Sequence, residues 1–95
     1  MYRVFITKKG QKSRRKLDRE VEPKLEQVIA KIAQNPYQNE LLEPPFKEYR
    51  IRTAHFSFKG TSFRIAYKIY EEKKSVVILY IGPRETFYQK LKRLI

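Results

Sequence analysis

The stretch "SFRIAYKIYEEKKSVVILYIG", Ser62–Gly82, contains two strand patterns joined by a short polar connector. In the first, large apolar residues alternate with other residues from Phe63 to Ile69, which is the period of a strand with one buried face. The second is apolar at every position after Ser75, which predicts a central strand covered on both faces. Because the connector "EEKK" is short, the two strands should be antiparallel neighbours.

A third strand is expected just upstream, in "KEYRIRTAHFSF", Lys47–Phe58. The connector "KGT" is again short, so the three strands form an antiparallel meander. We expect a three-residue loop with Gly60 in the left-handed conformation, because this register sets Arg52 opposite Lys68. A two-residue turn would set Arg52 opposite Tyr67 and bury a charge without a partner, which is costly.

The N-terminal half begins with a strand pattern, "YRVFI" at Tyr2–Ile6, and its clearest element is a helix that starts near Val21–Pro23 and ends at Asn35-Pro36. The apolar stripe of this helix comprises Val21, Leu25, Val28, Ile29 and Ile32. The basic run "TKKGQKSRRK" between them has no apolar period and is read as a loop or a polar helical turn.

These elements predict an α+β fold in a single domain, residues 1–95. A small antiparallel sheet, made of the N-terminal strand and the C-terminal three-strand meander, packs against one or two N-terminal helices. The tail "TFYQKLKRLI" predicts a short C-terminal helix whose apolar stripe of Phe87, Leu91 and Leu94 is buried only weakly.

The charge of the chain is strongly positive. Its 95 residues include 22 Lys and Arg against 10 Asp and Glu, a net charge of +12. So basic a chain is expected to bind a polyanion, and charge alone leaves RNA, DNA, the ribosome, an anionic membrane or an acidic protein open. No apolar run approaches the ~20 residues of a membrane span, and the N-terminus lacks a signal-peptide pattern. We therefore expect a cytoplasmic protein with no membrane partner.

The sequence also limits the chemistry that a site can use. The chain has one histidine, His55, no cysteine and three glycines. A zinc site, a pair of catalytic histidines and a glycine-rich phosphate loop are therefore excluded, and no Ser-His-Asp motif is present. We expect neither a metal nor a cofactor.

Basic residues gather on the outer face of the predicted meander. The expected alternation puts Arg50, Arg52, Arg64 and Lys68 on the face opposite the core, and Arg84 follows at the end of the next strand. Like charges placed this close repel one another, so their clustering indicates an anionic ligand, and a phosphate suits a guanidinium.

Three motifs carried by these residues, "YRIR", "FRIAY" and "ILYIGPRETFY", resemble the RelE/ParE superfamily of toxins from toxin–antitoxin modules. The resemblance implies a RelE-like fold and a type II toxin that acts as an endoribonuclease. Toxins of this kind cut messenger RNA on the ribosome by 2′-OH attack, and an acidic antitoxin protein is the expected partner.

The same resemblance implies a set of site residues. The catalytic candidates are Arg52, Arg64, Arg84 and Tyr88. The candidates for binding RNA or phosphate are Arg50, Lys68, His55 and Lys59. Two departures matter: arginine replaces the commoner lysine at position 52, where it is a poor general base, and the hairpin before Arg64 is long. His55 or Lys59 could then occupy the space that Arg52 would otherwise fill.

Two other functions stay open at this point. A ParE-type member of the superfamily would inhibit DNA gyrase without cutting RNA. A non-enzymatic RNA-binding or ribosome-binding domain would use the same basic face, although nothing in that function requires the "GPRETFY" motif.

Overall fold

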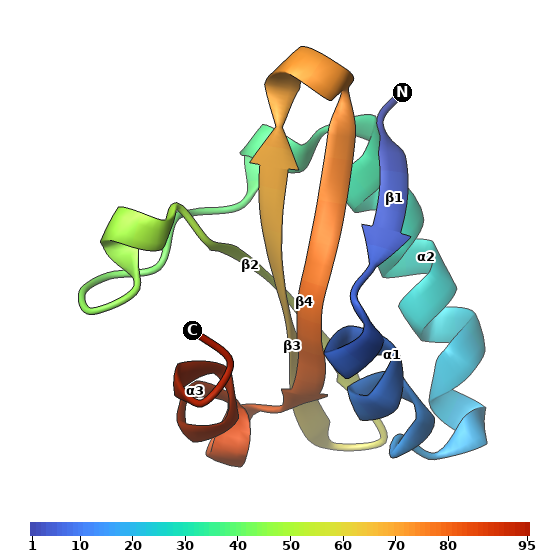
Figure 1. Ribbon diagram of the computed structural model, residues 1–95. Coiled ribbons are helices and arrows are strands. Elements are labelled where there is room, and N and C mark those ends of the chain that lie inside the picture. The colour runs from blue at the N-terminus through green and yellow to red at the C-terminus, as the bar shows by residue number, and fades with distance from the viewer.

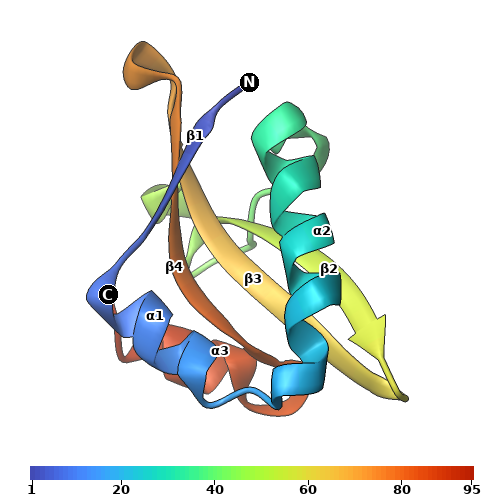
Figure 2. The same ribbon diagram turned by 90° about the vertical axis from the view of Figure 1, so that its right-hand side faces the viewer.

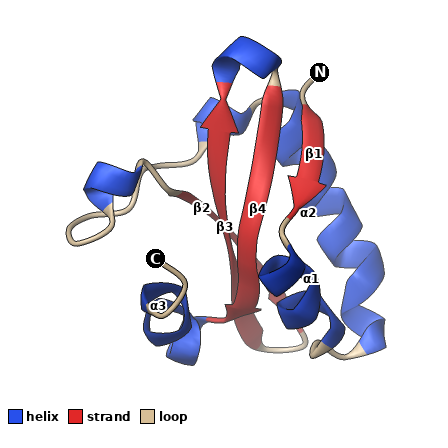
Figure 3. Ribbon diagram, in the orientation of Figure 1, coloured by secondary structure: helices blue, strands red, loops and turns tan.

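The chain forms one four-stranded sheet with three α-helices (Figures 1 and 3). A computed structural model describes all of residues 1–95. In chain order the elements are β1 (Arg3–Ile6), α1 (Lys8–Arg15), α2 (Glu22–Gln34), β2 (Arg52–Phe58), β3 (Thr61–Tyr70), β4 (Ser75–Pro83) and α3 (Arg84–Lys92). None of the helices combines the length and the apolar character that a membrane span requires. The predicted α+β class is confirmed.

The sheet has the strand order β1-β4-β3-β2. The predicted antiparallel meander of β2, β3 and β4 is confirmed, and β4 is an inner strand as expected. β1, however, pairs with β4 in parallel, so the sheet is mixed rather than wholly antiparallel. No hairpin dictates the direction of β1, because two helices and two strands separate it from β4 in sequence.

The β2–β3 hairpin closes with a two-residue turn, and the predicted three-residue loop is wrong. Lys59 and Gly60 both have positive φ, 48° and 81°, which is the geometry of a type I′ turn. This register sets Arg52 opposite Tyr67 instead of Lys68. β2 also begins later than predicted, because residues 47–49 form a 3₁₀ turn that ends at a left-handed Arg50.

The two faces of the sheet are covered by different elements, as Figure 2 shows for α2. On one face, here called the α2 side, the predicted stripe of α2 packs on β3 and β4 around Ile65 and Ile78. On the other, the α3 side, a smaller cluster comprises Leu42, Phe46, Ile51, Ala66, Phe87 and Leu91. The side chains of Phe87 and Leu91 are fully buried, so the predicted weak burial of the terminal helix is wrong: the segment before β2 covers it.

The basic run near the N-terminus forms the helix α1, which packs against the C-terminal half of β4. The hydroxyl of Thr7 caps it by accepting from the backbone N–H of Gly10 at 3.0 Å. A Cβ at Gly10 would lie 3.0 Å from the carbonyl oxygen of Ile78, so only glycine allows this close approach. The buried hydroxyl of Ser13 accepts from the backbone N–H of Ile81 at 3.0 Å.

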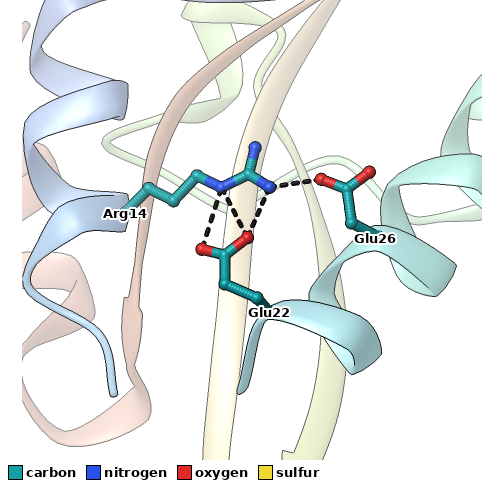
Figure 4. Close-up of polar contacts among 3 residues, drawn as sticks. All are labelled: Arg14, Glu22 and Glu26. Carbon is teal, nitrogen blue, oxygen red and sulfur yellow. Dashed lines mark hydrogen bonds and ion pairs between the residues drawn. The ribbon is translucent and has the colours of Figure 1, made fainter. Parts of the chain in front are cut away.

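α1 and α2 are held together by one arginine. The guanidinium of Arg14 donates from Nε to both carboxylate oxygens of Glu22 at 3.1 Å, and from an NH₂ group to Glu22 at 2.6 Å and to Glu26 (Figure 4). The hydrogen bond to Glu22 is the main cause of a raised pKa at Arg14, and the same bond lowers the pKa of Glu22. This bidentate contact fixes the angle between the two helices.

A second polar cluster ties the chain together at the opposite end of the sheet. The carboxylate of Glu71, in the turn between β3 and β4, accepts from the hydroxyls of Tyr2 at 2.5 Å and Tyr37 at 2.7 Å and from Lys74. These bonds, that of Lys74 first, lower the pKa of Glu71 to about 2. The N-terminus, the segment after α2 and the β3–β4 turn thus meet on one carboxylate.

We predict that in Glu71→Gln the free energy of unfolding falls less steeply as the pH is lowered than it does in the unmodified chain. Because the pKa of Glu71 is lower in the folded chain than its unfolded value of about 4.3, the carboxylate stabilises the fold above that pH, and this contribution is lost as the pH falls toward 2. Urea unfolding measured from pH 6 to pH 2.5 checks this. Glu72→Gln, at the exposed neighbouring position, is the control; identical pH curves for the two variants would contradict the assigned role.

Candidate functional site

The register of the β2–β3 hairpin brings His55 directly opposite Arg64. Because side chains alternate along a strand, both lie on the α3 side of the sheet, together with Ala66. Arg64 donates from NH1 to the hydroxyl of Tyr88 in α3 at 2.7 Å. The same NH1 lies 3.5 Å from Nε2 of His55. Three predicted site residues from two strands and a helix therefore meet at one guanidinium.

Tyr88 is positioned by the aromatic residues around it. Its ring centroid lies 6.0 Å from that of Phe46 and 5.3 Å from that of Phe87, the latter edge to face. The guanidinium carbon of Arg64 lies 5.4 Å from the centre of the Tyr88 ring, a cation–π contact in addition to the hydrogen bond. The tyrosine is still partly exposed, so its ring and hydroxyl are accessible to a ligand.

These residues open onto two adjoining hollows. One, of about 560 Å³, is lined by His55, Arg64 and Tyr88 and by residues of the segment before β2, including Glu40. The other, of about 230 Å³, shares His55 and Arg64 with the first and adds Arg84. The His55–Arg64 pair thus stands between the two, and Arg84 lies beyond it at the start of α3.

The electrostatics of the site favour a neutral His55. Its pKa is lowered first by partial desolvation and then by the positive charges of Arg64 and Arg84, while Glu40 acts in the opposite direction. Because a guanidinium only donates, the Nε2 atom that faces Arg64 is best placed to carry a lone pair. The hydroxyl of Thr53 lies 3.3 Å from the same nitrogen. Desolvation and the neighbouring cations therefore keep the imidazole in its neutral form, the form that can accept a proton.

Arg64 has a donor that no protein group satisfies. Its Nε–H is buried and has no hydrogen-bond partner, while its NH1 contacts Tyr88 and His55. An unsatisfied buried donor costs about 1–3 kcal/mol, and a ligand oxygen that accepts from it removes this penalty. With Arg84 nearby and no carboxylate paired to either arginine, the arrangement is suited to an oxyanion such as a phosphate.

Arg52 does not join this cluster. In the observed register it lies opposite Tyr67, whose ring belongs to the core of the α2 side. Its NH1 donates to the backbone oxygen of Asn39 at 2.6 Å, and its guanidinium lies 5.1 Å from the centre of the Tyr37 ring. The positive charge of Arg52, which we expected to lack a partner in this register, is therefore stabilised by these two contacts. Arg52 lies on the face of the sheet opposite to that of Arg64.

The other predicted phosphate contacts lie around the cluster or away from it. Arg50 is exposed to solvent, and it is the residue in left-handed conformation that ends a 3₁₀ turn. Lys59 is in the hairpin turn and pairs with Glu20. Lys68 lies on the same face as Arg64, farther along β3, with its amine 5.9 Å from the centre of the Tyr70 ring. The structure thus brings together His55, Arg64, Arg84 and Tyr88 out of the eight predicted residues.

Sequence reasoning missed the contribution of the segment before β2. Glu40 and Phe46 line the larger hollow, and Thr53 lies beside His55. The segment containing the first two has no apolar period, so its position over the α3 side left no signal in the sequence pattern. Thr53 could have been found, because it precedes His55 by two residues on a strand and therefore shares its face.

Comparison with known proteins gives the family. A family model described as "ParE-like toxin of type II bacterial toxin-antitoxin system" matches residues 4–92. The chain therefore belongs to this family of toxins, within the RelE/ParE superfamily that the motifs indicated. No curated protein sequence matches it.

Solved structures of RelE toxins share the fold. The RelBE2 toxin–antitoxin complex from Mycobacterium tuberculosis matches with 25% identity and a TM-score of 0.70, over 87% of this chain and 91% of that one. The intact RelBE complex of E. coli matches with 21% identity and a TM-score of 0.70, over 86% and 95%. A mutant E. coli RelE bound to an antitoxin RelBc peptide matches with 21% identity and a TM-score of 0.71, over 99% and 98%.

The single histidine makes the electrostatics of the site measurable. We predict that Arg64→Gln raises the pKa of His55 toward its ordinary value, because a positive charge next to the ring is removed, and that Glu40→Gln lowers it further. An NMR titration of the one imidazole signal checks both directions. Lys73→Gln, at an exposed position in the turn between β3 and β4, should leave the titration unchanged. A His55 pKa that is the same in all three variants would contradict the site geometry.

Proposed function

We propose that this toxin is an endoribonuclease that cleaves messenger RNA held on the ribosome, by attack of a 2′-OH on the adjacent phosphate. The observation that carries the proposal is the meeting of His55 and Tyr88 at the guanidinium of Arg64, with Arg84 in the adjoining hollow. A proton acceptor, a phosphate clamp and a hydroxyl donor are the groups that this reaction needs.

The reaction divides among these residues as follows. The 2′-OH gives its proton to the neutral His55 while its oxygen bonds to phosphorus, and the bond from phosphorus to the 5′ oxygen breaks. The products are a 2′,3′-cyclic phosphate and a 5′-OH. The guanidinium of Arg64, which lines both hollows, holds the non-bridging phosphate oxygens, where negative charge builds up in the transition state.

Arg84 and Tyr88 act on the leaving side. The positive charge of Arg84 stabilises the departing 5′ oxygen. The hydroxyl of Tyr88 accepts from Arg64 and keeps its own proton, which it can donate to that oxygen. The partly exposed ring of Tyr88 also offers a surface on which a base can stack.

The ribosome supplies what this site lacks. Arginines stabilise charge well and transfer protons poorly, so a site built around them gains most from a substrate already held in line for attack. RNA held by the ribosome meets this need, and the net charge of +12 favours its phosphate-rich surface.

We also propose that the partner of this toxin in the cell is an acidic antitoxin. The RelE toxins to which the chain is similar are seen in complexes with an antitoxin, and a chain of charge +12 favours an acidic protein. Co-expression of the acidic protein encoded beside this chain should relieve growth arrest and give a complex that co-purifies with the toxin. Arrest that persists, with no complex formed, would contradict the pairing.

A second candidate is inhibition of DNA gyrase without RNA cleavage. The ParE-like description of the matching family model favours it, and such a toxin would need a binding surface but no proton acceptor. The two functions differ in vitro: a nuclease produces new RNA 5′ ends on ribosomes, whereas a gyrase inhibitor stalls DNA cleavage and leaves messenger RNA intact.

We predict that Arg64→Ala and Arg84→Ala each lower the rate of messenger RNA cleavage about 100-fold or more, because each removes a charge that stabilises the transition state. Mapping of RNA 5′ ends on programmed ribosomes measures the rate. Arg52→Gln is the matched control: it also removes an arginine of the hairpin but lies on the α2 side, so cleavage per folded molecule should persist. Full activity in Arg64→Ala, or loss in Arg52→Gln alone, would contradict the proposed site.

A further inference from the structure

A third hollow is lined by residues of α1, α3 and the end of β4 that leads into α3. Figures 1 and 2 show α1 and α3 at this same end of the sheet. The hollow measures about 620 Å³, and its floor includes the aromatic rings of Phe63 and Tyr80. Five cationic side chains line it: Lys9, Lys12 and Lys16 from α1 and its end, and Lys90 and Arg93 from α3 and its end. This hollow is called the α1–α3 groove below.

The five cations of the groove are unpaired. None of them forms an ion pair, although Arg14, Lys59 and Lys74 elsewhere do. The only acidic residue that lines the groove is Asp18, whose carboxylate already accepts from the backbone N–H of Glu20. Five like charges around one hollow repel one another, and a polyanion that displaces their counterions relieves this repulsion.

The groove adjoins the candidate site. The hollow that contains His55, Arg64 and Arg84 also has Phe63 in its wall, and Phe63 is part of the floor of the groove. Pro83, next to Arg84 in the chain, lines the groove as well. α3 stands between the two regions, with Tyr88 in the wall of the site and Lys90 in the wall of the groove. A basic path therefore runs from Arg64 past Arg84 to the groove.

We propose that the α1–α3 groove binds the single-stranded RNA substrate on one side of the cleaved phosphate. This inference rests on the proposed ribonuclease function and names how that site takes its substrate. The lysines of α1 and the basic end of α3 contact successive phosphates, and Tyr80 offers a ring face to a base. The closeness of the groove to Arg84, whose neighbour Pro83 lines it, favours the substrate itself over a separate protein, because a strand clamped at Arg64 has to leave the site along a surface.

The test is binding of a single-stranded RNA of about twelve nucleotides, long enough to span both regions, whose sugars are 2′-O-methylated so that no 2′-OH is free to attack. Fluorescence anisotropy is measured over a range of salt concentrations. In the groove variant, Lys12→Gln, Lys16→Gln and Lys90→Gln are combined. In the control variant, Arg3→Gln, Lys47→Gln and Lys73→Gln are combined, which removes the same charge from exposed positions outside the groove. Thermal unfolding confirms that both variants fold.

We expect the groove variant to bind the RNA more weakly than the unmodified chain. The slope of log K against log salt concentration should become shallower by about 2, because three lysines are replaced and each phosphate contact to a single strand contributes roughly 0.7. The control should keep the slope of the unmodified chain. An RNA of about four nucleotides, which fits the site alone, should bind both variants equally.

Equal slopes for the groove and control variants with the longer RNA would overturn the proposal, and the groove would then be a docking surface for something other than RNA. The assay does not depend on cleavage. Loss of slope in the groove variant would therefore support RNA binding there even if the unmodified chain proved to cut no RNA, which would overturn the proposed function instead.

Discussion

The structure depends on the two-sided burial of β3. Its residues alternate between the core against α2, which takes Ile65 and Tyr67, and the cluster under α3, which takes Ala66. Arg64 falls in the second set, so the strand that holds the sheet together also presents to α3 the guanidinium that we propose as the phosphate ligand. A register slip of one residue would move every side chain of the strand to the wrong face. The same pairing that stabilises the fold therefore fixes the site.

α3 links the fold to both proposed RNA contacts. Its buried residues Phe87 and Leu91 hold it on the sheet, Tyr88 enters the candidate site, and Lys90 lines the α1–α3 groove. A short helix has little stability of its own, so its position comes from this burial and from the segment that covers it. Any partner that moved α3 would disturb the phosphate clamp and the RNA path together.

Most of the secondary structure and part of the site could be predicted from sequence, because the periodicity of apolar residues and the residues that end helices are local signals. The strand patterns, the stripe of α2 and the places of Arg64 and Arg84 followed from these signals, whereas Tyr88 was indicated by the resemblance to the toxin superfamily. The turn at Lys59-Gly60 did not, because the cost of burying Arg52 was judged without Asn39 and Tyr37, which lie on another segment and satisfy it. Once the register shifts, His55 takes the place opposite Arg64. For α1 the sequence left a loop and a polar helical turn both open, because the segment has no apolar period and only the Thr7 cap marks its start.

The central claim is that Arg64, with His55 and Tyr88, forms a phosphate site. The most direct measurement is a ¹⁵N–¹H NMR titration of the Arg64 Nε–H with a dinucleotide whose 2′-hydroxyl is replaced by hydrogen. The account predicts that this signal shifts with the His55 ring signal and with the same affinity, because both atoms face one bound phosphate. Saturable binding that left the Arg64 and His55 signals unmoved, while shifting that of Arg52, would contradict it.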